Sequence, residues 1–86
     1  MKIKGAIIKE QGVRFAVCNV DYETLKSVKK QNTIKNEFAP LFGKIPVIFV
    51  SYNSKGIATF VGREDIVNFL SNVDSSQINW REFTSQ

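Results

Sequence analysis

Apolar residues along this chain fall into runs whose spacing changes from strand-like to helical and back. Ile3–Lys9 is rich in β-branched residues and partly alternates, and Glu10-Gln11-Gly12 after it contains the glycine of a short hairpin loop. Val13–Val20 is apolar almost throughout, which is typical of a strand covered on both faces of a sheet. The first 20 residues are therefore predicted to form a β-hairpin whose second strand lies inside the sheet.

A helical region is predicted over residues 21–42. Asp21 suits the N-cap of a helix over about 22–31, because its carboxylate can accept a hydrogen bond from the first turn. The polar residues that follow weaken this helix, and a second helical segment is expected to end near Ala39. Pro40 comes next, and a proline inside a helix removes a hydrogen bond and clashes with the preceding turn.

The second half of the chain predicts a hairpin and a closing helix. Ile45–Val50 is the strongest strand pattern, the turn cluster Asn53–Gly56 follows it, and Ile57–Val61 forms the return strand. Four apolar residues then recur at the helical spacing i, i+3, i+4 and i+7, namely Ile66, Phe69, Leu70 and Val73.

The order β-β-α-β-β-α places the chain in the α/β (α+β) class. The helical crossover makes the second and third strands parallel, whereas both hairpins are antiparallel. We expect a four-stranded mixed sheet with helices packed on it. The 86 residues make one domain, composed of a β-hairpin (1–20), a helical crossover (21–42), a hairpin plus helix (45–73) and a C-terminal tail (74–86).

Short segments in the second half resemble the C-terminal half of thioredoxins, which has an Ile-Pro strand, a turn with glycine, a second strand ending in glycine and a closing helix. These segments are Ile45–Val50, Asn53–Gly56, Phe60–Gly62 and Ile66–Leu70. Phe15–Asp21 is similar to the strand before that family's second helix, so the resemblance covers roughly residues 13–73. It implies a thioredoxin-like half in which Pro46 is a cis-proline. The CxxC-bearing helix of that family is absent, so the resemblance implies no catalytic residue. The whole chain also resembles small bacterial proteins, and this second likeness implies no function.

Composition indicates a packed cytoplasmic protein. Apolar residues make up 43% of the chain, and seven Phe, two Tyr and one Trp are among them, which supports a core. A single cysteine cannot form an internal disulfide, which is typical of a reducing compartment. Charge comes too early in Met1–Gly5 for a secretory signal peptide, and no apolar run approaches the ~20 residues of a membrane span. We expect no membrane partner.

The sequence shows no recognisable arrangement of catalytic residues. The chain has no histidine, no acidic cluster spaced like a calcium loop and no glycine pattern of a phosphate loop. We therefore expect no enzyme activity, no metal and no cofactor. Cys18 has two interpretations: a nucleophilic thiol, which needs a nearby cation or helix terminus, or a small buried hydrophobe within its strand.

Positive charge is concentrated in the first part of the chain. Residues 1–35 hold eight basic and three acidic side chains, for +5, while residues 36–86 hold four basic and five acidic ones, for −1. The candidate anion-binding residues are Lys26, Lys29, Lys30 and Lys35. They are read either as part of a phosphate-facing patch for nucleic acid or as the solvated face of a helix.

Two features suggest contact with another protein. Trp80, Arg81 and Phe83 are candidate partner-binding residues, because Trp and Arg are enriched in interface hot spots; the alternative is that Trp80 packs on its own domain. An edge strand, either Ile3–Lys9 or Ile57–Val61, would allow pairing with another chain. The sequence therefore favours a non-catalytic domain that acts through protein–protein interaction, with an unknown protein partner or as a homodimer. The alternative is a nucleic-acid-binding accessory protein that uses the basic N-terminal half.

Overall fold

The centre of the sheet is strand β2 (Val13–Asn19), which is buried from Phe15 to Cys18. In the computed structural model, which describes residues 1–85, β2 pairs antiparallel with β1 (Lys2–Glu10) and parallel with β3 (Val47–Tyr52). Both arrangements confirm the prediction, because an apolar run covered on both faces belongs inside a sheet and a helical crossover leads to a parallel partner.

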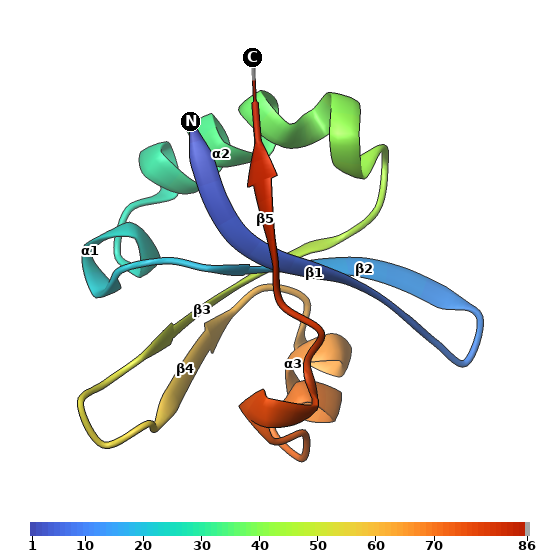
Figure 1. Cartoon of the computed structure of the whole chain (residues 1–86), viewed down its shortest axis with the longest axis vertical. Helices are drawn as coiled ribbons and strands as arrows, with labels where there is room; N and C mark the ends of the chain where they lie inside the picture. Colours follow the sequence, from blue (N-terminus) through green and yellow to red (C-terminus); the bar gives the residue numbers. More distant parts are fainter. Residues whose placement is uncertain (86) are drawn as a thin grey trace.

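A fifth strand corrects the expected four-stranded sheet. At one end, β4 (Ala58–Val61) pairs antiparallel with β3; at the other end, β5 (Arg81–Thr84) pairs antiparallel with residues 2–5 of β1. The strand order is therefore β4-β3-β2-β1-β5 (Figure 1). The C-terminal tail showed no strand pattern because β5 is only four residues long and gains its conformation by pairing with the opposite end of the chain.

Helices cover both faces of this sheet. One face carries α1 (Tyr22–Leu25) and α2 (Val28–Phe42), and the other carries α3 (Glu64–Leu70) and the short 3₁₀ helix η1 (Ser75–Gln77) (Figure 1). Met1 and Ser85 lie side by side on the α2 side, where the Ser85 N–H donates to the Met1 carbonyl at 2.8 Å (Figure 1). None of the helices within residues 1–85 has the length and apolar character to cross a membrane.

The crossover divides at Lys26–Ser27 and not after residue 31, so the predicted helix over 22–31 is wrong in its extent. The reason is a tertiary contact of Gln31, whose side chain is buried. Its Nε2 donates to the carbonyl oxygens of Thr24 at 3.2 Å and Leu25 at 3.0 Å, which belong to the last residues of α1. A helix end leaves such carbonyls without partners, and Gln31 supplies a donor to them.

Pro40 lies inside α2, which continues to Phe42 and so passes the expected end near Ala39. A proline this close to the end of a helix leaves few hydrogen bonds to be lost, and Gly43 N–H still donates to the carbonyl of Ala39 at 2.8 Å. The last turn is also held by packing, because Phe38 and Phe42 are both buried.

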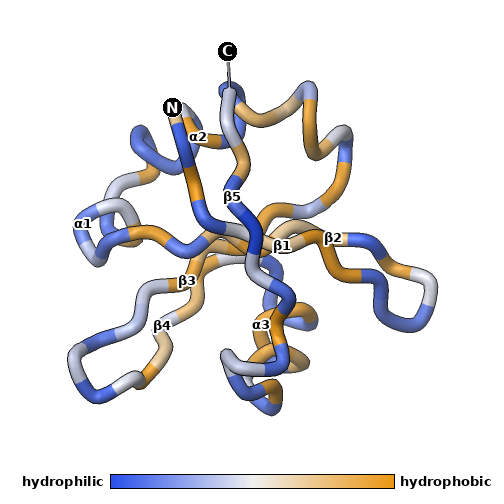
Figure 2. The backbone as a smooth tube through the Cα atoms, in the orientation of Figure 1, coloured by the Kyte–Doolittle hydropathy of each residue, from blue (hydrophilic) through white to orange (hydrophobic). Residues whose placement is uncertain are grey.

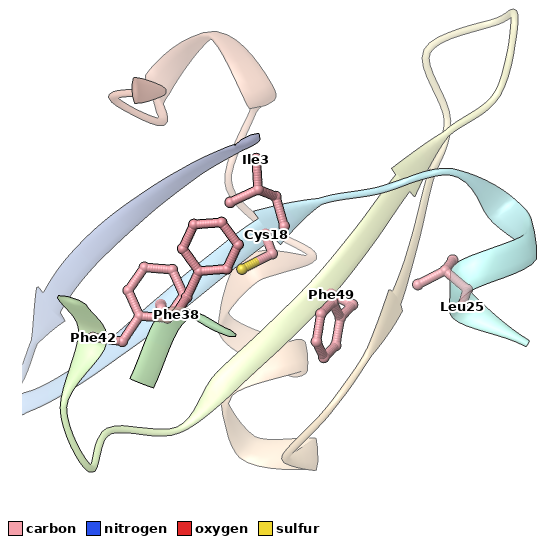
Figure 3. Close-up of a cluster of buried hydrophobic side chains, with 7 residues drawn as sticks. Ile3, Cys18, Leu25, Phe38, Phe42 and Phe49 are labelled. Atoms are coloured by element: carbon pink, nitrogen blue, oxygen red, sulfur yellow. The ribbon is translucent and has the colours of Figure 1, made fainter. Parts of the chain in front are cut away.

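The two faces of the sheet make two separate cores. The core under α1 and α2 consists of Ile3, Ala16, Cys18, Leu25, Phe38, Phe42 and Phe49 (Figure 3). The core under α3 consists of Phe15, Val17, Ile48, Val50, Ile66 and Leu70. The turns that end the two hairpins are polar and project away from both cores (Figure 2).

The peptide bond between Ile45 and Pro46 is trans, so the cis-proline implied by the thioredoxin resemblance is not found. The Pro46 carbonyl accepts a hydrogen bond from Ala16 N–H at 2.9 Å. The proline thus stands at the entry to β3, where a residue without N–H is tolerated.

Gly5 allows β1 to lie unusually close to its neighbouring strand β2. A Cβ atom at this position would lie 2.7 Å from the Val17 carbonyl oxygen and 3.5 Å from the Phe83 ring. We expect Gly5→Ala to lower the free energy of unfolding by about 1–3 kcal/mol, the usual cost of an overpacked interior. Urea unfolding measures this change. Lys9→Ala, at an exposed position of the same strand, is the control, and equal stabilities for the two variants would contradict the close approach.

The hydrogen bonds of Gln31 predict a second effect on stability. Gln31→Leu keeps a similar side-chain volume but removes the amide donor from the carbonyls of Thr24 and Leu25. We expect a loss of about 1–3 kcal/mol, because buried acceptors are then left unsatisfied. Thermal and urea unfolding measure it against Asn32→Ala, an exposed neighbour. An unchanged stability of Gln31→Leu would show that the amide does not hold the α1–α2 junction.

Candidate functional site

The outer side of β4 is an open edge of the sheet, since no strand within residues 1–85 pairs with it (Figure 1). Asn53 N–H donates to the carbonyl of Ile57 at 3.0 Å, and Ser51 stands opposite Thr59 in the β3–β4 register. Main-chain groups alternate in direction along an antiparallel strand. The N–H and C=O groups of Ala58 and Phe60 therefore point outward, and the edge presents two donors and two acceptors.

This edge carries no charge. No side chain from Ile57 to Val61 is ionisable, and Ile57 is 60% exposed. Arg63 follows the strand, but Asp65 accepts two hydrogen bonds from its guanidinium, at 2.7 and 2.8 Å. Natural sheets usually protect an open edge with charged side chains. β4 lacks this protection over its whole length.

A groove of about 250 Å³ lies next to the edge, on the α3 side of the sheet. Ala58 and Phe60 line it from the strand, and Leu70 and Ser71 line it from the end of α3. Tyr52 also borders the groove; burial first, and then the charge of Asp74, raise the pKa of its hydroxyl above the ordinary value. The edge and the groove together form a surface that suits an extended segment, and we call it the β4 edge.

The three candidate partner-binding residues of the tail make contacts within the domain. Trp80 is half-buried, its Nε1 donates to the carbonyl of Ser75 at 3.1 Å, and its ring meets Tyr52 edge-on at 6.3 Å. Phe83 packs edge-on against Phe42 at 5.3 Å, and the Arg81 guanidinium lies 5.7 Å from the Phe83 ring centre. These contacts attach the tail to the sheet; a further role of Trp80, Arg81 and Phe83 in binding a partner stays a prediction.

The structure brings together only part of the candidate anion-binding set. Lys29 and Lys30 line a groove of about 420 Å³ near the start of α2, which Ser27 and Thr33 also border. The other two lysines have neighbours of their own. Lys26 forms a 3.6 Å ion pair with Glu23, and the Lys35 Nζ lies 5.9 Å from the Phe49 ring centre.

Cys18 lies in the core under α2, beside Ile3 and Phe38, and is fully buried (Figure 3). Burial raises the pKa of its thiol to about 12. A thiol that stays protonated at neutral pH is a poor nucleophile. Of the two interpretations of Cys18, its position therefore favours a small buried hydrophobe.

The acidic side chains within residues 1–85 form no cluster that suits a metal ion. A third groove, of about 360 Å³, lies between the β1–β2 hairpin and α3 and includes Glu10 and Asp65. The hydrogen bond from Arg63 lowers the pKa of Asp65 to about 2, so this carboxylate is already engaged. Within residues 1–85, no three acidic or cysteine side chains come close enough to hold an ion.

Comparison with known proteins gives no match: no protein-family model, no curated protein and no solved structure is similar to this chain. Inferences about its role therefore rest on its own residues and geometry. Sequence reasoning named Ile57–Val61 as a possible edge strand, but the groove beside it depends on how α3 packs and had no signal in the sequence.

The burial of Cys18 predicts a slow reaction with thiol reagents. At pH 8 the folded protein should react far more slowly than the urea-unfolded chain, because its thiol pKa is about 12 against an ordinary value of 9.0. The same shift stabilises the fold below pH 9, and this contribution is lost as the pH rises from 9 towards 12. Alkylation followed by mass spectrometry measures the rates. Equal rates for the folded and unfolded chains would contradict the burial.

Proposed function

We propose that this domain is a non-catalytic protein-binding module whose β4 edge accepts an extended strand of a partner. One observation carries the proposal: main-chain donors and acceptors of Ala58 and Phe60 face outward from an edge without a charged side chain. Strand addition to an exposed edge is a common mode of peptide recognition, in which main-chain hydrogen bonds provide affinity and alternate side chains provide specificity.

The energetics favour a modest but specific complex. Each main-chain hydrogen bond contributes about 0.5–1.5 kcal/mol net. Full burial of an exposed side chain such as Ile57 adds about 1.5–3 kcal/mol. The groove beside Ala58 and Phe60 offers a position for one further side chain of the incoming strand. These contributions must exceed the entropy lost on association, so a short and flexible partner segment would bind weakly.

A binding role also agrees with the chemistry of the chain. The sequence has no histidine, and its single cysteine lies in the core, so neither of the most common nucleophile–base arrangements can be built. A single buried thiol supports a cytoplasmic location as part of the same proposal.

The relation to thioredoxins belongs to this proposal as well. Along the chain, β2, the helical crossover, β3, β4 and the closing helix α3 follow one another in the order that the resemblance to the C-terminal half of that family implies. In this proposal the N-terminal strand β1 replaces the first strand and the CxxC-bearing helix of that family. We propose a thioredoxin-like half that keeps the supporting strands without the dithiol.

A second candidate function is contact with a nucleic-acid backbone. It is supported by the groove in which Lys29 and Lys30 lie beside the hydroxyls of Ser27 and Thr33. Both lysines are exposed, and such a groove would meet phosphates rather than bases. We rank this candidate second because Lys26 and Lys35, the other members of the predicted set, interact with Glu23 and Phe49.

The proposal predicts that partners depend on the main chain of β4. Tagged protein is incubated with lysate of its source organism, with and without nuclease, and the retained proteins are identified by mass spectrometry. We expect protein partners to survive nuclease and to be lost with Ala58→Pro, which removes one outward N–H while leaving the bonds to β3 in place.

Ala58→Val is the matched control, because it keeps the N–H and should retain the same partners. Circular dichroism and thermal unfolding establish that both variants fold. Partners that Ala58→Pro still retains would contradict strand addition at β4. Loss of every partner with nuclease would favour the nucleic-acid candidate instead.

A further inference from the structure

We infer that the strand which pairs with β4 is the β4 of a second copy of this chain, related by a two-fold axis. This inference rests on the function proposed above and names the partner. Two identical protomers would then share one continuous sheet, with their α2 sides on the same face. The β4 edge complements itself in its main-chain groups and in its side chains.

Main-chain geometry selects the register. The outward groups of Ala58 and Phe60 are all used when Ala58 faces Phe60 of the partner subunit and Phe60 faces Ala58 of the partner subunit. The two-fold axis then passes beside Thr59, which faces Thr59 of the partner subunit. Two main-chain hydrogen bonds then form on each side of the axis, four in all.

Side chains on the α2 side of the sheet match in this register. Ile57, Thr59 and Val61 share that face, because Val61 packs on the core under α2 and side chains alternate along a strand. Ile57, which is 60% exposed, would face Val61 of the partner subunit. At the axis, threonine faces threonine, which is a favourable cross-strand pair.

The opposite face matches by size. Ala58 and Phe60 lie on the α3 side, where both pack against the core under α3. Each alanine would stand opposite a phenylalanine, so a small side chain faces a large one. The groove of about 250 Å³ opens beside Ala58 on this face, where Phe60 of the partner subunit would lie.

The neighbouring registers lose the apolar pair of Ile57 with Val61 of the partner subunit and set a charged side chain against an apolar one. A shift of two residues in one direction sets Arg63 against Ile57 of the partner subunit, and a shift in the other direction sets Lys55 against Val61 of the partner subunit. A shift of one residue reverses the faces and breaks the two-fold symmetry. In the favoured register Lys55 faces Arg63 of the partner subunit, whose charge Asp65 already offsets.

Other edges of the sheet are less suited to self-association. Residues 6–10 of β1 extend beyond β5 and lack a strand on that side within residues 1–85, but Lys9 and Glu10 are charged. The outer side of β5 carries Arg81 and Glu82 within four residues. Only β4 among these edges combines outward main-chain groups with an uncharged sequence.

The test introduces a charge at Thr59, the residue at the two-fold axis. Analytical ultracentrifugation of the wild-type protein over a wide concentration range should show a monomer–dimer equilibrium. Thr59 is exposed, so Thr59→Lys and Thr59→Glu should both fold, and each should weaken self-association about tenfold or more because like charges face each other. A mixture of the two variants should restore dimers, with one copy of each variant in every dimer.

A second variant tests the same geometry by covalent capture. Thr59→Cys would place two thiols at a non-hydrogen-bonded antiparallel pair, where the Cα atoms lie about 4.5 Å apart, within the range of a disulfide. Mild oxidation should yield disulfide-linked dimers. Ser54→Cys, in the exposed turn before β4, should yield far fewer, and Cys18 is buried and does not compete.

The outcomes separate this inference from the function on which it rests. A wild-type protein that stays monomeric at every concentration, or charge variants that associate like the wild type, would overturn the second copy as the partner. If lysate partners that depend on Ala58 persist in that case, strand addition to a different protein stands. If no partner is retained either, both the inference and the proposed function fail.

Discussion

Burial of β2 on both of its faces is the constraint on which the rest of this structure depends. Phe15 and Val17 point to one face and Ala16 and Cys18 to the other, and each of the four is almost completely covered. An 86-residue chain can cover both faces only with helices on either side. The α1–α2 pair and α3 supply these two layers, and the connections between strands follow from that need.

Completing the sheet brings the two ends of the chain together. β5 pairs with the start of β1, and Phe83 reaches the core under α2, where its ring meets Phe42. Trp80 closes the other face through Tyr52 and the carbonyl of Ser75. The tail is therefore part of the fold, and its aromatic residues are explained by packing. Among the edges that remain, β4 differs by having no charged side chain and a groove beside it.

The proposed binding role of β4 requires no chemistry beyond main-chain hydrogen bonds and the burial of side chains. The outward main-chain groups of Ala58 and Phe60 are a consequence of strand pairing alone, since one side of an outermost strand is always unpaired. What sets this edge apart is the exposed Ile57 and the self-matching series around Thr59. Elsewhere, the exposed Lys29 and Lys30 line the groove to which the second proposed function refers.

The sequence by itself determined the elements whose patterns are local. The apolar run of β2, the strand that follows Pro46 and the amphipathic stripe of α3 each follow from neighbouring residues, as does an edge strand near Ile57. Tertiary structure decided the rest. Gln31 ends up buried because carbonyls of α1 need a donor, and Arg81–Thr84 becomes a strand because β1 has an unpaired side. Such features depend on contacts between distant segments, for which no periodicity within a segment gives a signal.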